Sequence, residues 1–345
     1  MRKILIWLTV LPAMAAALSM RGESPVGQDA AIAKDTVVAV EAADTAATVD
    51  VIGWFGKSDT VTYWIHNTSW KINDTDTVRS GLVSTKVRIT VVDSTADGYK
   101  IDYTFLEIPT DTMSDTPEGK LQKRLIEKLK RKIIGTSVHF ETDECGRITR
   151  YSNLDQIKKQ AKSLFDDAMK EMLRMPEIKS LKKMGFDVKD YAGKVDADKL
   201  VEEYISELNL LFLNHGLSMP LGEITEHEDA TETQYENTSY RSVSVDEDDG
   251  AYHVVYDVVN IIPQSDIKAM VGGVVEAFKN KSLAENFSEN FDSQVTEDAT
   301  YEDLICIDYM PGGWPYRVVK QKRTMIGNRG KLEQTVVSLD SCALH

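Results

Sequence analysis

Residues 99–108, YKIDYTFLEI, and residues 137–152, SVHFETDECGRITRYS, decide the fold, because a similar pair of segments returns later in the chain. The first segment alternates apolar and polar residues, as a strand with one buried face does. The second predicts a hairpin around residues 143–146, and an amphipathic helix over 120–134 lies between the two. In the second copy the strand AYHVVYDVVNII (251–262), a helix from Ser265 and the hairpin TYEDLICIDYMPGGWPYRVVKQ (300–321) follow in the same order. The sequence therefore predicts an internal repeat of about residues 98–151 and 250–320.

Further strands and helices extend this plan on both sides. Alternating apolar residues predict strands over 61–72, 82–92 and 230–245, and a closing hairpin over 323–339. Apolar residues at helical spacing predict a long helix over 154–184, bent at Pro176, and another over 198–213. We therefore expect one α+β domain over residues 53–345. It is predicted as a curved, half-barrel-like antiparallel sheet, with the helices of 120–134, 154–213 and 265–279 packed on one face.

The first 52 residues have a different character. Residues 1–19 read as a secretory signal peptide, with Arg2 and Lys3 before an apolar run and small residues for cleavage near Ala17 to Ser19. The apolar run is shorter than the roughly 20 residues that cross a bilayer, so we expect no membrane-spanning segment. Residues 20–52, rich in Ala, Asp and Thr, are predicted to be a disordered acidic arm. The mature protein is therefore expected in the periplasm or outside the cell.

The overall charge excludes some partners. The formal net charge is −15 at pH 7, which argues against nucleic acid and against anionic membrane surfaces. The chain has six histidines and none of the motifs HExxH, GxSxG, GxxxxGK[ST] or GxGxxG. We therefore predict a non-enzymatic protein without catalytic residues.

Two motifs match metal sites only in part. His139 and Glu141, followed by Cys145, match the start of a zinc deaminase motif whose Pro-Cys-x-x-Cys half is missing. Residues 246–250, DEDDG, look like the start of a calcium loop, but Asp257 stands where the loop needs glutamate. An acidic turn between two strands explains that segment better. We therefore predict neither a metal ion nor a cofactor.

Two further motifs have both a functional and a structural interpretation. Ser180 with Lys183, and Ser265 with Lys268, match the Ser-x-x-Lys pattern, although a serine near a helix start is more often a cap. Residues 312–315, Gly-Gly-Trp-Pro, fit either a ligand-contacting loop or a hairpin turn whose tryptophan folds back on the sheet. We favour the structural interpretation in both cases.

Three cysteines, Cys145, Cys306 and Cys342, are an odd number for an oxidising compartment. The sequence permits three pairings and does not choose among them. One disulfide and three buried thiols both remain open.

The phrases Glu144-Cys145-Gly146-Arg147-Ile148 and Gly313-Trp314-Pro315-Tyr316 resemble those of a family of secreted Bacteroidetes proteins of unknown function. The order of strands and helices is also distantly similar to the periplasmic lipoprotein-carrier fold. That resemblance implies a half-barrel whose concave apolar face is covered by helices and accepts acyl chains. It implies no catalytic residues.

These observations lead to two hypotheses of function. The first is a binding protein for an apolar or lipid-like molecule held between sheet and helices, near Phe165, Met172, Phe212 and Phe278. A closed core is the ordinary alternative for the same four residues. The second hypothesis is a structural component of the cell envelope that meets a protein partner through its acidic surface or a strand edge. A hydrolase would need a pair of spaced carboxylates, which the sequence does not indicate.

Overall fold

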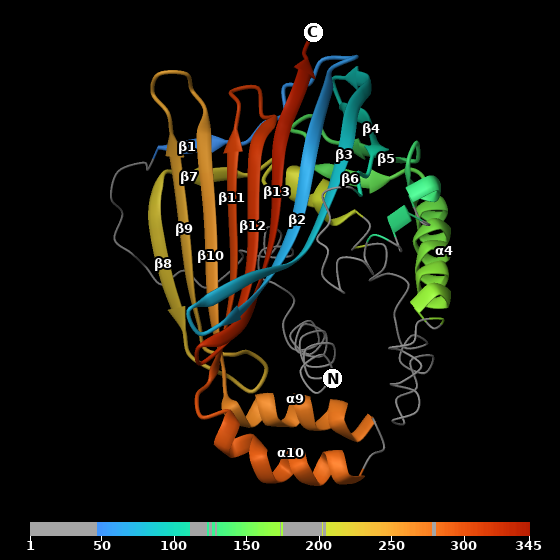
Figure 1. The fold of residues 1–345 in the computed structure, drawn as a ribbon. Coiled ribbons are helices and arrows are strands. Elements are labelled where there is room, and N and C mark those ends of the chain that lie inside the picture. The colour runs from blue at the N-terminus through green and yellow to red at the C-terminus, as the bar shows by residue number, and fades with distance from the viewer. Residues whose placement is uncertain are drawn as a thin grey trace.

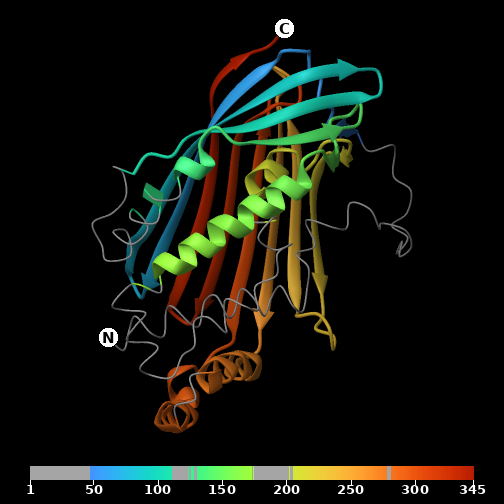
Figure 2. The same ribbon diagram turned by 90° about the vertical axis from the view of Figure 1, so that its right-hand side faces the viewer.

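The computed structural model describes residues 47–110, 123, 126–127, 130–172, 174, 202, 205–277 and 281–345. In these residues the dominant feature is an antiparallel sheet of 11 strands in the order β6-β5-β4-β3-β2-β13-β12-β11-β10-β9-β8. The sheet curves, and its edge strands β6 and β8 lie apart, so it remains open (Figures 1 and 2). A separate pair of short strands, β1 and β7, lies beside it.

The strands and helices have the following bounds. The first half contains β1 (Thr48–Asp50), β2 (Thr60–Asn73), β3 (Asp76–Thr95), β4 (Gly98–Glu107), β5 (Ser137–Thr142), β6 (Ile148–Tyr151) and α4 (Leu154–Met172). The second half contains α8 (Ser206–Leu211), β7 (Ser218–Pro220), β8 (Gly222–Glu228), β9 (Asn237–Val245), β10 (Tyr252–Ile262), α9 (Gln264–Ala277), α10 (Lys281–Gln294), β11 (Ala299–Tyr309), β12 (Pro315–Ile326) and β13 (Arg329–Ala343).

The two segments that the sequence analysis compares have the same order of strand pairing. In the first copy β4 pairs with β5, and β5 with β6. In the second copy β10 pairs with β11, and β11 with β12. The two copies meet through β2 and β13, which pair over their whole length. The first copy thus runs from the centre of the sheet outward, and the second runs from the outside inward to β12 beside β13.

Period-two alternation gives the sheet a concave face that carries the core. Along β4, Ile101, Tyr103 and Phe105 are buried while the residues between them are half-buried. The same alternation buries Ile305, Ile307 and Tyr309 on β11, and the register places all of these residues on the concave side. The main core therefore occupies one end of the concave face, where α8 and residues 212–217 cover it.

A second, smaller core lies at the other end of the same face. Ile262 and Ala299, at the strand ends of β10 and β11, pack with Ile267 of α9 and Phe291 of α10. In Figure 1 the α9–α10 hairpin sits at the lower ends of these strands. The concave face therefore has an apolar cluster at each end.

The predicted fold class holds for the sheet and only partly for the helices. The structure is mostly β, and the helix predicted over 265–279 contacts the strand ends of the concave face instead of lying along it. The strand predicted over 230–245 is present only as β9 from Asn237, because residues 229–236 are a connection and the separate strand β8 precedes them. Alternation alone does not reveal β8, whose residues are all exposed.

The remaining helix predictions lie partly outside the described residues. The helix over 154–184 is described as α4 to Met172, and that over 198–213 as α8. Residues 130–133 are helical, in agreement with the helix predicted over 120–134. The signal peptide and residues 20–46 of the predicted arm lie outside the described range, whereas residues 47–52 are ordered, with β1 paired to β7 and Val51 buried. Among the described residues, no helix is both long and apolar enough to cross a membrane.

Candidate functional site

Between its two apolar ends, the concave face carries a band of polar side chains. The register of β2, β13, β12, β11, β10 and β9 places these side chains on the same side as the buried Ile65, Val337 and Val254. Most are half-buried, and Asp303 is only 3% exposed. We call this set the middle band: Asn67, Ser69, Ser239, Arg241, Tyr256, Asp303, Lys320, Lys322, Glu333 and Thr335.

Hydrogen bonds connect the middle band to α8. The hydroxyl of Thr335 donates to Oδ1 of Asn67 at 2.6 Å, and Nδ2 of Asn67 donates to Oε1 of Glu207 at 3.1 Å. The hydroxyl of Tyr256 donates to Oδ1 of Asn214 at 2.9 Å. The segment that covers the main core is therefore attached to the sheet partly by polar contacts.

Buried polar groups gather where the middle band meets the main core. Tyr252 stacks on Tyr309 with 4.8 Å between ring centroids, and Tyr309 lies close to Asn214 and Tyr256. Burial raises the pKa of Tyr256 to about 12 and raises those of Tyr252 and Tyr309 further. The hydroxyl of Tyr252 has no hydrogen-bond partner in the described part of the chain, whereas Asn214 lies within hydrogen-bonding reach of Tyr309. Unsatisfied groups of this kind cost about 1–3 kcal/mol each, so this place can accept a polar ligand atom or water.

Phe212 lies inside a closed aromatic cluster. Its ring centroid is 5.1 Å from that of His215, 5.2 Å from that of Phe140 and 6.3 Å from that of Trp314. Phe55 completes the cluster, at 4.1 Å from Trp314. At 5% exposure, Phe212 belongs to the packed core, which is the alternative that the sequence left open for it.

Of the other three predicted ligand contacts, only the side chain of Phe165 is described. Phe165 is half-buried on α4. Met172 ends α4, but its side chain and the whole of Phe278 lie outside the described residues. The grouping of these four residues around a ligand therefore remains a prediction.

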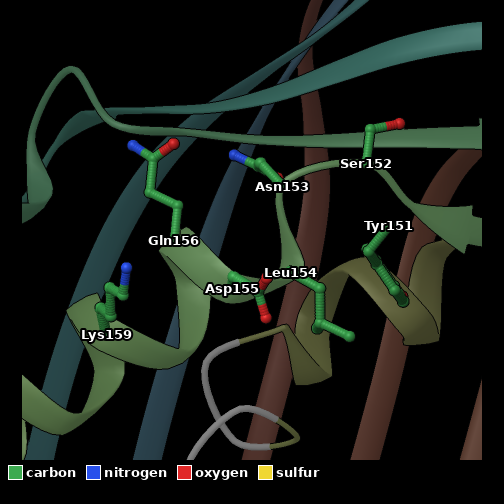
Figure 3. A pocket seen from close by; sticks show the side chains of 7 residues that line it. All are labelled: Tyr151, Ser152, Asn153, Leu154, Asp155, Gln156 and Lys159. Atoms are coloured by element: carbon green, nitrogen blue, oxygen red, sulfur yellow. The ribbon is translucent and has the colours of Figure 1, made fainter.

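A pocket of about 670 Å³ lies where β6 passes into α4. Tyr151 and Leu154 extend to one side of it, whereas Asn153 and Gln156 extend to the other (Figure 3). Asn153 is fixed, since its amide donates to the carbonyl of Ser137 at 3.0 Å. The hydroxyl of Tyr151 contacts Oδ1 of Asn209 on α8, so the pocket borders the cover of the concave face. Its remaining lining residues are Ser152, Asp155 and Lys159.

The short motifs have structural roles where they are described. Nδ1 of His139 lies 2.5 Å from Asp102 on the neighbouring strand, at an exposed position. The amine of Lys268 pairs with Asp292 at 2.7 Å, and Ser265 stands in the first turn of α9. Within the described ranges, no three His, Cys, Asp or Glu side chains gather closely enough to hold a metal ion. Ser180 and Lys183 lie outside those ranges.

Two turns match their structural interpretations. Residues 246–250 connect β9 to β10 as an acidic turn. Trp314 is 1% exposed, so it folds back into the core and is not a ligand-contacting tip. All three cysteines are free thiols in the structure.

Sequence reasoning missed His215, whose side chain occupies the centre of the aromatic cluster. Its Nε2 lies 3.0 Å from the carbonyl oxygen of Gly313, and burial lowers its pKa to about 4. The middle band was missed as well. Its residues alternate with convex-face residues of similar polarity, and strand alternation then gives no signal.

Comparison with known proteins yields partial similarity to solved structures. No protein-family model matches the chain, and no curated protein matches it. A structure described as lipid–protein interactions in lipovitellin is similar over 84% of this chain at 10% identity, with a TM-score of 0.40. The match spans about a quarter of that protein's chain, 26%.

Two bacterial structures are less similar. One is a putative outer membrane lipoprotein-sorting protein domain from Vibrio parahaemolyticus, at 9% identity and a TM-score of 0.13 over 85% of this chain and 86% of that chain. The other is an outer membrane channel from Pseudomonas putida, at 8% identity and a TM-score of 0.13 over 87% of this chain and 100% of that chain.

Proposed function

We propose that this protein is a non-enzymatic binding protein that holds an elongated amphiphile, such as a lipid, along the concave face of its sheet. The observation that carries the proposal is the order of surfaces on that face. An apolar core at one end is followed by the half-buried middle band and then by the apolar cluster under α9 and α10. A molecule with both apolar and polar parts matches such a face better than a purely apolar one.

Tyrosines on the concave face support this ligand class. A tyrosine offers a large apolar ring and a hydroxyl at its tip, so it contacts both parts of an amphiphile. The hydroxyl of Tyr252 is buried without a partner in the described structure, and a ligand oxygen would satisfy it. The register places six tyrosines on this face: Tyr63, Tyr103, Tyr252, Tyr256, Tyr301 and Tyr309.

The expected site of action is the periplasm or the cell exterior. This part of the proposal rests on residues 1–19, which have the charge and apolar run of a secretory signal. A carrier in an aqueous compartment must shield the apolar part of its ligand from water, and a covered concave face provides that shelter.

Native mass spectrometry tests the proposal directly. The protein is purified from its own cell envelope, and its intact mass is measured before and after unfolding in organic solvent. The expected result is a mass excess on the folded protein that is released on unfolding and identified as an amphiphile. A clean apo mass, with no uptake when phospholipid or fatty acid is offered, would contradict the proposal.

A pair of matched substitutions locates the ligand on one face. Thr324 on β12 lies opposite Tyr301 and so faces the concave side, whereas Thr300 on β11 lies opposite Ile261 and faces the convex side. Both threonines are half-buried. Thr324→Trp is expected to reduce ligand occupancy at least severalfold, and Thr300→Trp to leave it unchanged. Equal occupancy in both variants, with normal unfolding transitions, would remove the concave face as the binding surface.

A further inference from the structure

We propose that the free edge of β8 is a docking site for an extended, basic peptide segment of a partner protein, which adds to the sheet as its next strand. This inference concerns a different surface from the concave face and does not depend on the amphiphile. It rests on the backbone geometry of β8 and on the charges that flank it.

β8 is an edge strand with continuous pairing on its inner side. It is the last strand of the sheet, and it pairs with β9 in continuous register from Gly222 opposite Val243 to Glu228 opposite Asn237. All seven of its residues are exposed, and GEITEHE contains neither proline nor lysine. Every second residue of an edge strand directs its N–H and C=O groups away from the sheet. No described strand pairs with this outer edge, so an incoming strand finds a row of backbone partners there.

The opposite edge of the sheet lacks this character. β6 has only four residues, Ile148–Tyr151, and the chain passes directly from it into α4. Arg150 on β6 is held by a two-pronged interaction with Glu141, at 2.7 and 3.1 Å. Short length is one of the usual protections of an edge strand. β8 is therefore the edge at which strand addition is expected.

The charges of β8 define the partner. Glu223 and Glu226 are exposed and have no hydrogen-bond or ion-pair partner within the described part of the chain. They face opposite sides of the sheet, because they are an odd number of residues apart. Glu228 is already engaged by Asn237 at 3.0 Å, while Ile224 is 40% exposed between the two free carboxylates. The matching strand carries basic residues opposite Glu223 and Glu226 and an apolar residue opposite Ile224.

The same charges make a second copy of this chain a poorer match than a basic segment. Antiparallel pairing of β8 with itself around Thr225 would place Ile224 opposite the Glu226 of the other copy. In the same register Glu228 faces Gly222 and Glu223 faces His227, so no glutamate of β8 faces a lysine or arginine. A basic segment from another protein gains opposite-charge pairs at the same positions.

A synthetic peptide is the probe. In antiparallel pairing, the N-acetylated, amidated peptide Thr-Thr-Lys-Thr-Val-Lys-Thr places its two lysines opposite Glu226 and Glu223 and its valine opposite Ile224. The full-length protein is titrated with this peptide, and backbone amide shifts and hydrogen exchange are recorded. The expected result is saturable binding that weakens with added salt, with new protection at alternate amides of residues 222–228. A peptide with glutamates in place of the lysines is expected to give no protection.

Two double variants with equal charge change separate this edge from general acidity. Glu223→Lys with Glu226→Lys is expected to weaken peptide binding roughly tenfold. Two attractive pairs with the peptide lysines are lost, and repulsive pairs replace them. Glu144→Lys with Glu289→Lys changes two exposed carboxylates on other elements and is expected to leave binding within about twofold. Equal weakening by both double variants, or protection that appears away from residues 222–228, would overturn the proposal. Both sets of positions are exposed, so each variant is expected to fold.

Discussion

The Nε2 atom of His215 lies 3.0 Å from the carbonyl oxygen of Gly313, which joins the segment after α8 to the β11–β12 hairpin. A carbonyl oxygen only accepts hydrogen bonds, so Nε2 carries the proton and donates it. The imidazole is 1% exposed and packs against the rings of Phe55 and Phe212. His215 is therefore held as a neutral side chain in the packed core.

Stability is expected to fall as the solution becomes acidic, and His215 is expected to account for part of the loss. Burial lowers its pKa from 6.5 to about 4, so the unfolded chain binds the proton more readily than the folded protein. The stabilisation is complete above pH 6.5 and disappears progressively between pH 6.5 and about 4. Because one pKa unit corresponds to about 1.4 kcal/mol, the free energy of unfolding should drop by about 3 kcal/mol over this range. Urea denaturation at several pH values measures the slope.

The variant His215→Asn separates this histidine from the other titrating groups. It is expected to be less stable at pH 7, but its free energy of unfolding should depend less on pH between 6.5 and 4. His227→Asn changes an exposed histidine and should retain the wild-type slope. An unchanged slope in His215→Asn would show that other groups cause the acid sensitivity.

The two tryptophans beside the β11–β12 hairpin should differ sharply in their contribution to stability. Trp314 is 1% exposed and packs on Phe55, whereas Trp54 is 70% exposed. Trp314→Ala leaves a cavity and is expected to reduce the free energy of unfolding by about 3–5 kcal/mol. Trp54→Ala is expected to change it by less than about 0.5 kcal/mol. Chemical denaturation measures both values, and similar losses in the two variants would contradict the packing described for Trp314.

Much of the sheet could be predicted from the sequence because its strands alternate strongly. The alternation of apolar residues in β4 predicts this strand directly, as with Ile101, Tyr103 and Phe105. The order of strand, helix and hairpin suggests the internal repeat. β8 gave no such signal, since its only large apolar residue, Ile224, is exposed. Alternation of apolar and polar residues identifies a strand through its buried face. A strand without a buried face therefore cannot be predicted from this alternation.

The candidate site was less predictable for a related reason. Phe212 was recognised as apolar and helical, but only long-range contacts with Phe140 and Trp314 show that it belongs to a closed cluster. To predict the middle band, one must know which side chains of each strand point to the concave face, and the sequence of a single strand does not show this. Register between strands distant in sequence decides it, as for Asn67 and Thr335 on β2 and β13.

Two glycine-to-alanine substitutions should have opposite effects on stability. Gly313 has a φ of +83°, and a Cβ atom there would lie 2.2 Å from the carbonyl oxygen of Ile52. Gly313→Ala is therefore expected to destabilise the protein by at least about 2 kcal/mol. Gly273 is exposed within α9, and no atom lies within 4 Å of its added Cβ. Gly273→Ala should stabilise the protein by up to about 1 kcal/mol through helix propensity. Thermal and urea unfolding of the two variants test both signs.

The three cysteines should behave as distinct thiols. Cys342 is exposed, whereas burial raises the pKa of Cys306, with Asp308 adding to the rise. The pKa of Cys145 is also raised by burial, and by Asp143 and Glu144. Since the thiolate is the reactive form, Cys342 is expected to react first with a disulfide reagent at pH 7.5, and the other two more slowly.

A thiol count in denaturant without reductant decides between the two states that the sequence permits. Three reactive thiols per chain are expected, because the structure holds all three cysteines free. A count of one would show that a disulfide had formed. In the folded protein, Cys342→Ser should remove the fast phase while Cys306→Ser keeps it. Loss of the fast phase in Cys306→Ser would instead assign the most reactive thiol to β11, where burial predicts the slower one.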